Sequence, residues 1–432
     1  MSGFTLEHDD GISRGARALL VLPDRNGVNN PRSVDSRLDE AAGLAEAIGI
    51  EIVDRKAFRI RAPRPATLFG KGQVEQISEL AKAANASLLV IDSALSPAQQ
   101  KNLEDSTKTK VIDRTGLILE IFGERAATSE GRLQVELAHL DYQAGRLVRS
   151  WTHLERQRGG FGFLGGPGET QIEADRRMIR DRMARIRKEL EQVKRTRGLH
   201  RDRRQRAPWP VIALVGYTNA GKSTLFNRLT SSSVFAEDLL FATLDPTMRE
   251  MKLPGFDKAI LSDTVGFVSN LPTELVAAFR ATLEEVRSAD LILHVRDIAH
   301  HDSDAQKGDV EEVLASLGLG DGEGPPRLEL WNKVDLLDAD ARVAIEAEAL
   351  RREDVATLSA IRGDGIDPLL DRIAAHLQGE SAVHNVSLSL TDGSKLAWLH
   401  SRGEVIDSST LDETIHLSVR LSPENWERFQ AL

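Results

Sequence analysis

The stretch GYTNAGKST, Gly216 to Thr224, decides the fold of the central part of this 432-residue chain. It follows the apolar run Val211 to Val215 and precedes a segment with helical spacing, the strand-loop-helix setting of a phosphate-binding loop. Glycines let backbone N–H groups converge on phosphates, Lys222 can reach the β and γ oxygens, and the Ser223 hydroxyl can ligate magnesium. All nine residues are predicted to line a nucleotide site: Gly216, Tyr217, Thr218, Asn219, Ala220, Gly221, Lys222, Ser223 and Thr224.

A second motif, NKVD from Asn332 to Asp335, follows the strand-like run Arg327 to Leu330 and indicates which base is bound. Guanine offers two adjacent donors that one carboxylate can accept together, whereas N1 of adenine is an acceptor and would leave Asp335 unpaired. Rejecting a base that leaves a buried polar group unsatisfied is worth about 10⁴-fold, which favours GTP over ATP. The predicted guanine contacts are Asn332, Lys333, Asp335, Ser359 and Ala360, the last two following the run Val355 to Leu358.

Two further motifs lie between these and have the order expected of switch loops. In DTVGF, Asp263 to Phe267, the aspartate is predicted to hold magnesium through water, and the Gly266 amide is predicted to contact the γ-phosphate. In FATLDPT, Phe241 to Thr247, one threonine should join the magnesium shell; Thr243 is preferred and Thr247 is the alternative. The further predicted nucleotide contacts are Phe241, Ala242, Thr243, Asp263, Thr264, Val265 and Gly266. The predicted magnesium ligands are Ser223, Thr243 and Asp263, and the predicted catalytic residues are Lys222, Thr243 and Gly266.

The residue after the DTVGF glycine predicts slow intrinsic turnover. Many GTPases place a glutamine there to orient the attacking water, but Phe267 can neither donate nor accept a hydrogen bond. Catalysis should therefore be mostly electrostatic, through Lys222, magnesium and backbone amides. Asn219 matches the asparagine of potassium-dependent GTPases, so stimulation by K⁺ is a hypothesis, and the alternative is that Asn219 only caps the loop.

Composition narrows the class of protein. Apolar residues make up 41% and charged residues 28% of the chain, which is ordinary for a soluble protein, and no apolar run approaches the ~20 residues that span a bilayer. The absence of cysteine excludes disulfides, thiolate metal sites and a cysteine nucleophile. Together with an N-terminus unlike a secretory signal, this predicts a cytoplasmic protein.

Composition and periodicity predict an α/β multidomain fold with four parts. Residues 1–128 should form a small α/β domain, residues 129–207 a basic coiled-coil hairpin with a glycine-rich tip loop, and residues 208–378 a GTPase domain with a mostly parallel sheet. A small α+β domain should occupy residues 379–432. Two helical seams support the hairpin: Leu133, Leu137, Leu140, Ala144, Leu147 and Trp151, then Ile172, Ile179, Met183, Ile186, Leu190 and Val193.

The predicted second helix of the hairpin is strongly basic. Residues 176–206 contain fourteen Lys/Arg and four Asp/Glu, although the whole chain has a net charge of −10. This excess favours contact with RNA over a merely solvated coiled coil, and both alternatives remain open. In the helix-breaking loop RGGFGFLGGPGE, Arg158 to Glu169, Phe161 or Phe163 could stack on bases, or the aromatics could pack on a neighbouring domain.

These motifs in order, preceded by GGPGETQIEADRR from Gly165 to Arg177, resemble the HflX family of translational GTPases, within the Obg-HflX group. The resemblance runs from about Arg17 to Gln378, and GTPases of this type also carry a hydrophobic residue at the position of Phe267. It implies GTP or GDP with Mg²⁺ at the site, and binding to the large ribosomal subunit and its rRNA. It further implies splitting or recycling of stalled or idle ribosomes. A monomer is expected.

Two other functions compete with this interpretation. One is a GTP-dependent switch that binds a protein effector or non-ribosomal RNA; the other is an RNA-remodelling ATPase acting through the N-terminal domain, which needs a second phosphate site. FGKGQ, Phe69 to Gln73, lacks phosphate-loop spacing and is interpreted as a tight strand-to-helix turn. His300, His301, Asp302 and Asp304 are interpreted as a solvated loop and not a metal cluster, because adjacent loop residues rarely converge on one ion.

Overall fold

The computed structural model describes residues 14–25, 32–157, 176–193, 209–230, 247–269, 285–320, 322, 324–378, 382–411, 414–421, 423–430 and 432. The chain divides into two compact units. The first contains the chain up to Glu189 and also includes Ser269, while the second begins at Leu190 and contains most of the remainder. None of the helices described is long and apolar enough to cross a membrane.

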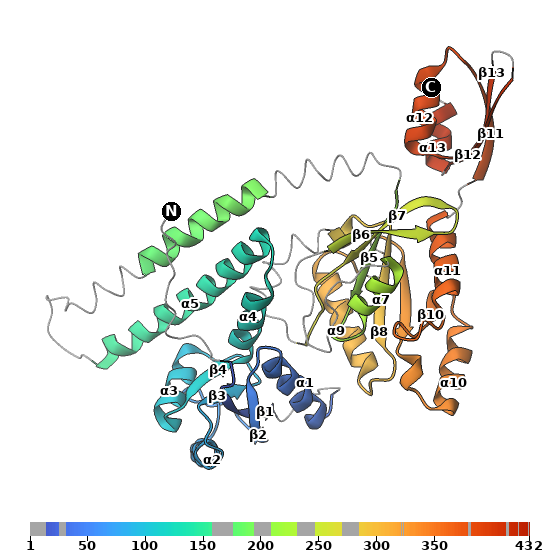
Figure 1. Cartoon of the computed structure of the whole chain (residues 1–432). Helices are drawn as coiled ribbons and strands as arrows, with labels where there is room; N and C mark the ends of the chain where they lie inside the picture. The colour runs from blue at the N-terminus through green and yellow to red at the C-terminus, as the bar shows by residue number, and fades with distance from the viewer. Residues whose placement is uncertain are drawn as a thin grey trace. The chain divides into compact units, whose positions relative to one another are not determined.

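The first unit contains a parallel four-stranded sheet in the order β2-β1-β3-β4 (Figure 1). The central strands β1 and β3 are buried because their residues are almost all aliphatic. The elements are β1 (Arg17–Arg25), α1 (Val34–Glu46), β2 (Glu51–Ile60), α2 (Lys71–Ala83), β3 (Leu88–Ile91), α3 (Pro97–Thr107), β4 (Lys110–Asp113) and α4 (Arg114–Arg125). This confirms the predicted α/β fold; the edge strand β2 was not predicted, since its charged residues give no strand pattern.

The two helices predicted for the hairpin are α5 (Ser129–Gln157) and the helix of residues 176–193. Figure 1 shows them side by side and antiparallel, and Arg182 joins Glu136 through two hydrogen bonds of 2.7 and 2.9 Å. Met183 and Ile186 of the second seam are buried, as predicted. The tip loop and residues 194–206 lie outside the described residues.

A second stripe on α5 attaches this helix to the α/β sheet. Val135 and Ala138 are buried, and one turn further Tyr142 donates a 2.6 Å hydrogen bond to the buried carboxylate of Asp113, which ends β4. Burial raises the pKa of Tyr142, and the charge of Asp113 adds to this rise. Arg146 pairs with the same carboxylate at 3.0 Å. The sequence indicated only the coiled-coil seam, because Tyr142 and Arg146 look like solvated residues until Asp113 faces them.

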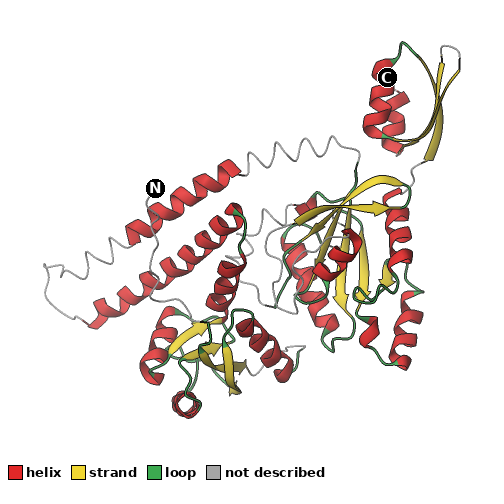
Figure 2. Ribbon diagram, in the orientation of Figure 1, coloured by secondary structure: helices red, strands yellow, loops and turns green. Residues whose placement is uncertain are grey.

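The second unit contains a six-stranded sheet in the order β10-β9-β8-β5-β7-β6, with helices around the strands (Figure 2). All adjacent pairs are parallel except β6 with β7, which confirms the predicted mostly parallel sheet. The strands are β5 (Val211–Gly216), β6 (Thr247–Leu253), β7 (Phe256–Asp263), β8 (Leu291–Asp297), β9 (Arg327–Asn332) and β10 (Val355–Thr357). The helical elements are α7 (Lys222–Thr230), α9 (Ser303–Ser316), η1 (Val334–Leu336), α10 (Ala339–Ala349) and α11 (Ile366–Gln378).

The C-terminal segment forms a three-stranded antiparallel sheet in the order β11-β13-β12. Its elements are β11 (Ala382–Ser389), α12 (Gly393–Arg402), β12 (Glu404–Leu411), β13 (Thr414–Leu421) and α13 (Pro423–Gln430). A separate apolar core forms where the two helices pack on the sheet, and it includes Leu399, Leu417 and Val419. The predicted α+β character of this segment is confirmed.

A buried histidine in β8 predicts how the second unit responds to acid. Burial lowers the pKa of His294 to about 3, with the cations Arg296, Lys307 and Arg327 contributing and Glu329 opposing the shift. Because the unfolded chain takes up this proton near pH 6.5 and the folded chain does not, stability is complete above pH 6.5 and decreases as the pH falls. We expect a loss of about 1.4 kcal/mol per pH unit between pH 6 and 4.5.

Between pH 6 and 4.5 the titration of the neighbouring Glu329 does not contribute to the change in stability. The pKa of Glu329 is lowered to about 2 by its hydrogen bonds against the cost of burial, so Glu329 contributes only below pH 4.5. Chemical denaturation of His294→Leu from pH 7 to 4.5 should show a shallower loss than the parent, whereas His376→Gln, at an exposed histidine on α11, should not. An unchanged slope in His294→Leu would contradict the assignment.

Candidate functional site

The phosphate loop connects β5 to α7, and two of its glycines are required by the backbone. Gly216 has φ +152° and Gly221 has φ +96°, which L side chains rarely adopt. A Cβ at Gly216 would collide with the Val295 carbonyl oxygen, and one at Gly221 would collide with the Asn332 side chain. The loop can therefore pass closely between β8 and the residue that ends β9.

Lys222, the first residue of α7, is buried at the centre of this loop. Its Nζ donates hydrogen bonds to the carbonyl oxygens of Gly216, at 3.1 Å, and Tyr217, at 2.7 Å. Burial lowers the pKa of Lys222 to about 8, against the opposing charge of Asp263. A partly desolvated ammonium at a helix N-terminus is suited to bind an anion.

Two of the three residues predicted to hold magnesium, Ser223 and Asp263, come together at the end of β7. Ser223 Oγ donates a 3.0 Å hydrogen bond to Asp263 Oδ2. Ser223 follows Lys222 in α7, and Asp263 is the last residue of β7. Thr264 Oγ1 donates to the Leu214 carbonyl oxygen at 2.6 Å, which fixes the start of the DTVGF loop against β5. A hydroxyl and a carboxylate are hard oxygen ligands, so this pair fits Mg²⁺.

The DTVGF loop lies directly on the phosphate loop. Phe267 N–H donates to the Gly216 carbonyl oxygen at 3.1 Å, and Thr218 N–H donates to the Phe267 carbonyl oxygen at 2.7 Å. A Cβ at Gly266 would lie 2.9 Å from Thr218 Cγ2 and 3.0 Å from Lys222 Nζ, so a side chain there would displace the lysine. The Phe267 ring is buried.

Asn332 of the NKVD motif joins two loops of the predicted guanine site. Its Nδ2 donates to the Ala220 carbonyl oxygen at 2.8 Å, and its Oδ1 accepts from the Ala360 N–H at 2.9 Å. The asparagine thus holds the phosphate loop against the loop of Ser359 and Ala360, both of which are buried. In the part of the chain that the structure describes, Asn332 therefore has a structural role, which is to fix these two loops relative to one another.

The two charged residues of the motif, Lys333 and Asp335, have charged neighbours that the sequence did not suggest. Lys333, in a left-handed conformation with φ +65°, places its Nζ 2.8 Å from Asp297, the last residue of β8. The carboxylate of Asp335 is almost buried and lies 3.9 Å from Arg362 Nε. Arg228 of α7 donates to the carbonyl oxygen of Ala360 at 2.6 Å and so supports the same loop. Among these neighbours only Asp297 could have been suggested by the sequence, because a polar residue at the end of a strand is a candidate for a site.

The structure therefore brings together the phosphate loop, DTVGF, NKVD and the Ser359 loop at the carboxyl edge of one sheet. The predicted switch residues Phe241, Ala242 and Thr243 lie outside the described residues, and the alternative Thr247 is the first residue of β6. The glycine-rich segment Gly165 to Asp175 also lies outside them.

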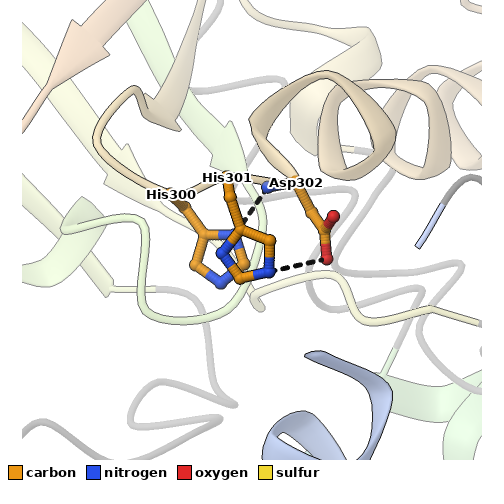
Figure 3. Close-up of side chains that lie close together, drawn as sticks. All are labelled: His300, His301 and Asp302. Atoms are coloured by element: carbon orange, nitrogen blue, oxygen red, sulfur yellow. Dashed lines mark hydrogen bonds and ion pairs between the residues drawn. The ribbon is translucent and has the colours of Figure 1, made fainter. Parts of the chain in front are cut away.

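His300, His301 and Asp302, in the loop before α9, lie closer together than the solvated-loop interpretation implied (Figure 3). The two imidazoles stack with centroids 4.6 Å apart, and His301 Nε2 lies 3.6 Å from Asp302 Oδ2. However, His300 Nδ1 accepts a 3.1 Å hydrogen bond from the Asp302 backbone N–H, which places the neutral ring's proton on Nε2. Neither nitrogen then offers a free lone pair to an ion, and we assign no metal to this cluster.

Comparison with known families accounts for nearly the whole chain. Four family models match: GTP-binding GTPase N-terminal over residues 35–123, GTP-binding GTPase Middle Region over 125–204, 50S ribosome-binding GTPase over 211–333, and HflX C-terminal domain over 344–430. The motif residues from Gly216 to Asn332 fall within the third of these matches.

Proteins named GTPase HflX are similar to this chain over most of its length. The protein of Magnetococcus marinus is 48% identical over 393 residues, which cover 91% of this chain and 90% of that protein. The protein of Escherichia coli is 44% identical over 393 residues, covering 90% of this chain and 91% of that protein. Identity at this level over nearly complete chains, with the nucleotide motifs assembled at one sheet edge, shows that this protein belongs to the HflX family and is a GTPase.

Proposed function

We propose that this GTPase binds the large ribosomal subunit through its basic hairpin and uses the GTP cycle to separate or recycle stalled or idle ribosomes. The observation that carries the proposal is the exposed basic surface of the helix of residues 176–193. Within it, exposed cationic side chains recur along the helix: Arg177, Arg180, Arg185, Arg187 and Lys188. Arg182, by contrast, pairs with Glu136 of α5, so the hairpin uses one arginine for its own packing.

Two further facts support a ribosomal partner. The model that matches residues 211–333 is described as a 50S ribosome-binding GTPase. The surrounding sequence of residues 176–206 carries fourteen Lys/Arg against four Asp/Glu in a chain whose net charge is −10. A confined basic stripe on an acidic protein suits a phosphate-rich partner such as rRNA, with binding that weakens as salt rises.

We propose the following roles at the nucleotide site. Asp335 accepts the two donors of guanine, while Asn332, Ser359 and Ala360 hold the base-binding loops together. Lys222 and the amides from Gly216 to Thr224 bind the phosphates and stabilise the charge that develops on the transferred phosphoryl group. The Gly266 amide contacts the γ-phosphate, and this contact is lost when GTP is hydrolysed.

Ser223, Thr243 and Asp263 would hold Mg²⁺, which when bound neutralises phosphate charge. The structure supports the pair Ser223 and Asp263 by their 3.0 Å approach. Asn219, exposed on the loop with φ +59°, is where K⁺ would be held if it stimulates the reaction. Because the buried Phe267 cannot orient water, intrinsic turnover should be slow until the partner orders the switches.

Co-sedimentation with purified ribosomal subunits tests the partner. The full chain should sediment with the large subunit in a non-hydrolysable GTP analogue and much less in GDP. A variant with Arg177, Arg180, Arg185, Arg187 and Lys188 all changed to glutamine should bind at least about 100-fold more weakly, with a salt slope reduced by several units. The reason is that each cation replaced by glutamine removes one contact with a phosphate.

The matched control changes five exposed cations of the first unit's α/β region to glutamine: Lys56, Arg61, Lys71, Lys82 and Lys101. This variant has the same net charge as the test variant and should bind almost as the parent does. If both variants bound the large subunit equally weakly, the effect would come from net charge alone and not from the position of the cations. Absence of sedimentation in either nucleotide would favour the protein-effector switch instead.

A further inference from the structure

The phosphate loop contains a threonine whose buried hydroxyl is not used by the fold. Thr218, between β5 and α7, is only 5% exposed, and its Oγ1 is buried with no hydrogen-bond partner among the residues that the structure describes. Its backbone N–H, by contrast, is bonded to the Phe267 carbonyl oxygen at 2.7 Å. An unpaired buried hydroxyl costs stability, so native proteins keep few of them, and a catalytic role is one explanation for those that they keep.

Two other buried threonines show how the fold satisfies such a group elsewhere. Thr107 Oγ1 donates to the Leu103 carbonyl oxygen at 2.8 Å. Thr264 Oγ1 donates to the Leu214 carbonyl oxygen at 2.6 Å. In both cases a backbone carbonyl replaces water as the acceptor. Thr218 differs from them in having its hydroxyl available for a ligand of the site.

The Thr218 side chain lies beside the two groups that we propose contact the γ-phosphate. A Cβ at Gly266 would lie 2.9 Å from Thr218 Cγ2 and 3.0 Å from Lys222 Nζ, so the threonine and the ammonium are on the same side of this glycine. Oγ1 is bonded to the same carbon as Cγ2, and the hydroxyl therefore lies beside Gly266 too. The ammonium has a third N–H besides the two that it donates to the carbonyl oxygens of Gly216 and Tyr217.

A hydroxyl in this place has the chemistry that the residue after Gly266 lacks. Phe267 can neither donate nor accept a side-chain hydrogen bond, whereas a threonine hydroxyl can do both. It can donate to a γ-phosphate oxygen and accept from the attacking water. The water oxygen bonds to the γ-phosphorus while the bond to the β,γ-bridging oxygen breaks, and its electron pair leaves with GDP. The proton of the water passes to the released phosphate, so the hydroxyl keeps its own.

We propose that Thr218 is a catalytic residue for GTP hydrolysis, whose hydroxyl donates to the γ-phosphate and accepts from the attacking water. The proposal rests on the roles proposed above for Lys222 and Gly266. All three residues belong to the second unit. The hydroxyl thus supplies, from the phosphate loop, the orientation of water that many GTPases obtain from a glutamine of the DxxG loop.

Thr218→Val tests the proposal because it keeps the shape of the side chain and removes the hydroxyl. Single-turnover phosphate release at saturating GTP should slow by about 10-fold to 100-fold, the range for one hydrogen bond to a charged group. In calorimetry the affinity for GDP, which has no γ-phosphate, should stay within about twofold of the parent, whereas the affinity for a non-hydrolysable GTP analogue should fall at least about threefold.

Denaturation separates a catalytic role from a structural one. Since no described residue bonds to the hydroxyl, the urea midpoint of Thr218→Val without nucleotide should be no lower than that of the parent. Thr218→Ser keeps the hydroxyl and should retain most of the rate. Thr230→Val is the matched control, because Thr230 Oγ1 donates to the Phe226 carbonyl oxygen at 2.7 Å at the other end of α7. It should change neither the rate nor the affinity for the analogue.

The proposal is supported if the rate and the affinity for the analogue both fall in Thr218→Val while Thr218→Ser retains them. It is overturned if either quantity stays within about twofold of the parent in Thr218→Val, or if GDP affinity falls in parallel. A lower urea midpoint in Thr218→Val would give the hydroxyl a structural role and would also overturn it. If Lys222→Ala is slow and Thr218→Val is not, only the role of Thr218 is wrong and the assignment of the site stands.

Discussion

Asp335→Asn should lower the affinity for GDP by about 10⁴-fold and raise the affinity for the corresponding xanthine nucleotide. In the proposed site the carboxylate of Asp335 accepts both N1–H and the 2-amino group of guanine. An asparagine amide offers one acceptor and one donor, so the 2-amino group would face a donor. Xanthine has an oxygen at that position and restores both hydrogen bonds. Calorimetry of the purified parent and variant chains with GDP, ADP and the xanthine nucleotide, in the presence of magnesium, measures the affinity for each nucleotide.

Asp338→Asn is the matched control, because this aspartate lies three residues further on and caps α10 by accepting from the Ala341 N–H at 2.8 Å. It should keep the cap of α10, because asparagine caps helices about as well as aspartate does, and it should keep the parent's preference for guanine. If Asp335→Asn keeps the parent's preference for guanine, the base-binding role of NKVD is wrong. If the parent shows no preference for guanine over adenine nucleotides, the whole assignment of the site fails.

Lys222→Ala should lower kcat for GTP hydrolysis by about 10³-fold, because it removes the buried ammonium that we propose binds the phosphates, at a site expected to work by electrostatic stabilisation. At pH 7 the side chain is mostly protonated, since its pKa is lowered only to about 8. The variant should also bind GTP less well. Single-turnover phosphate release at saturating GTP separates the two effects.

Lys258→Ala serves as the control, because this partly exposed lysine of β7 pairs with Glu250 of the edge strand β6 at 3.2 Å. It should retain the parent's kcat. Persistent turnover of ATP by Lys222→Ala would indicate a second phosphate site and favour the RNA-remodelling ATPase over the present account. GTP hydrolysis at the parental rate in Lys222→Ala would contradict the mechanism.

Elements that depend on local sequence were predictable, whereas elements that depend on contacts between distant residues were not. The strands β5, β8 and β9 were predictable because each is a short, mostly apolar run followed by polar residues. Strands β2 and β6 were missed because their charged residues leave no strand pattern, and their pairing with β1 and β7 decides their conformation.

Side-chain roles show the same division. The prediction that Lys222 binds phosphate and that Asp335 binds the base follows from residue type and spacing. That Asn332 joins two loops, or that Asp297 holds Lys333, requires the strands β8, β9 and β10 to be adjacent. His300, His301, Asp302 and Asp304 were interpreted as a solvated loop, and only the loop geometry shows that the two histidine rings stack.

By itself the sequence determined the order of the nucleotide motifs, the preference for guanine and the class of fold, because these depend on local spacing and on the donors and acceptors of individual residues. The tertiary structure alone decided that α5 is fastened to Asp113 by Tyr142, and that the Thr218 side chain lies against Gly266. Such contacts join residues tens of positions apart and leave no periodic pattern, so folding has to bring them together before they can be recognised.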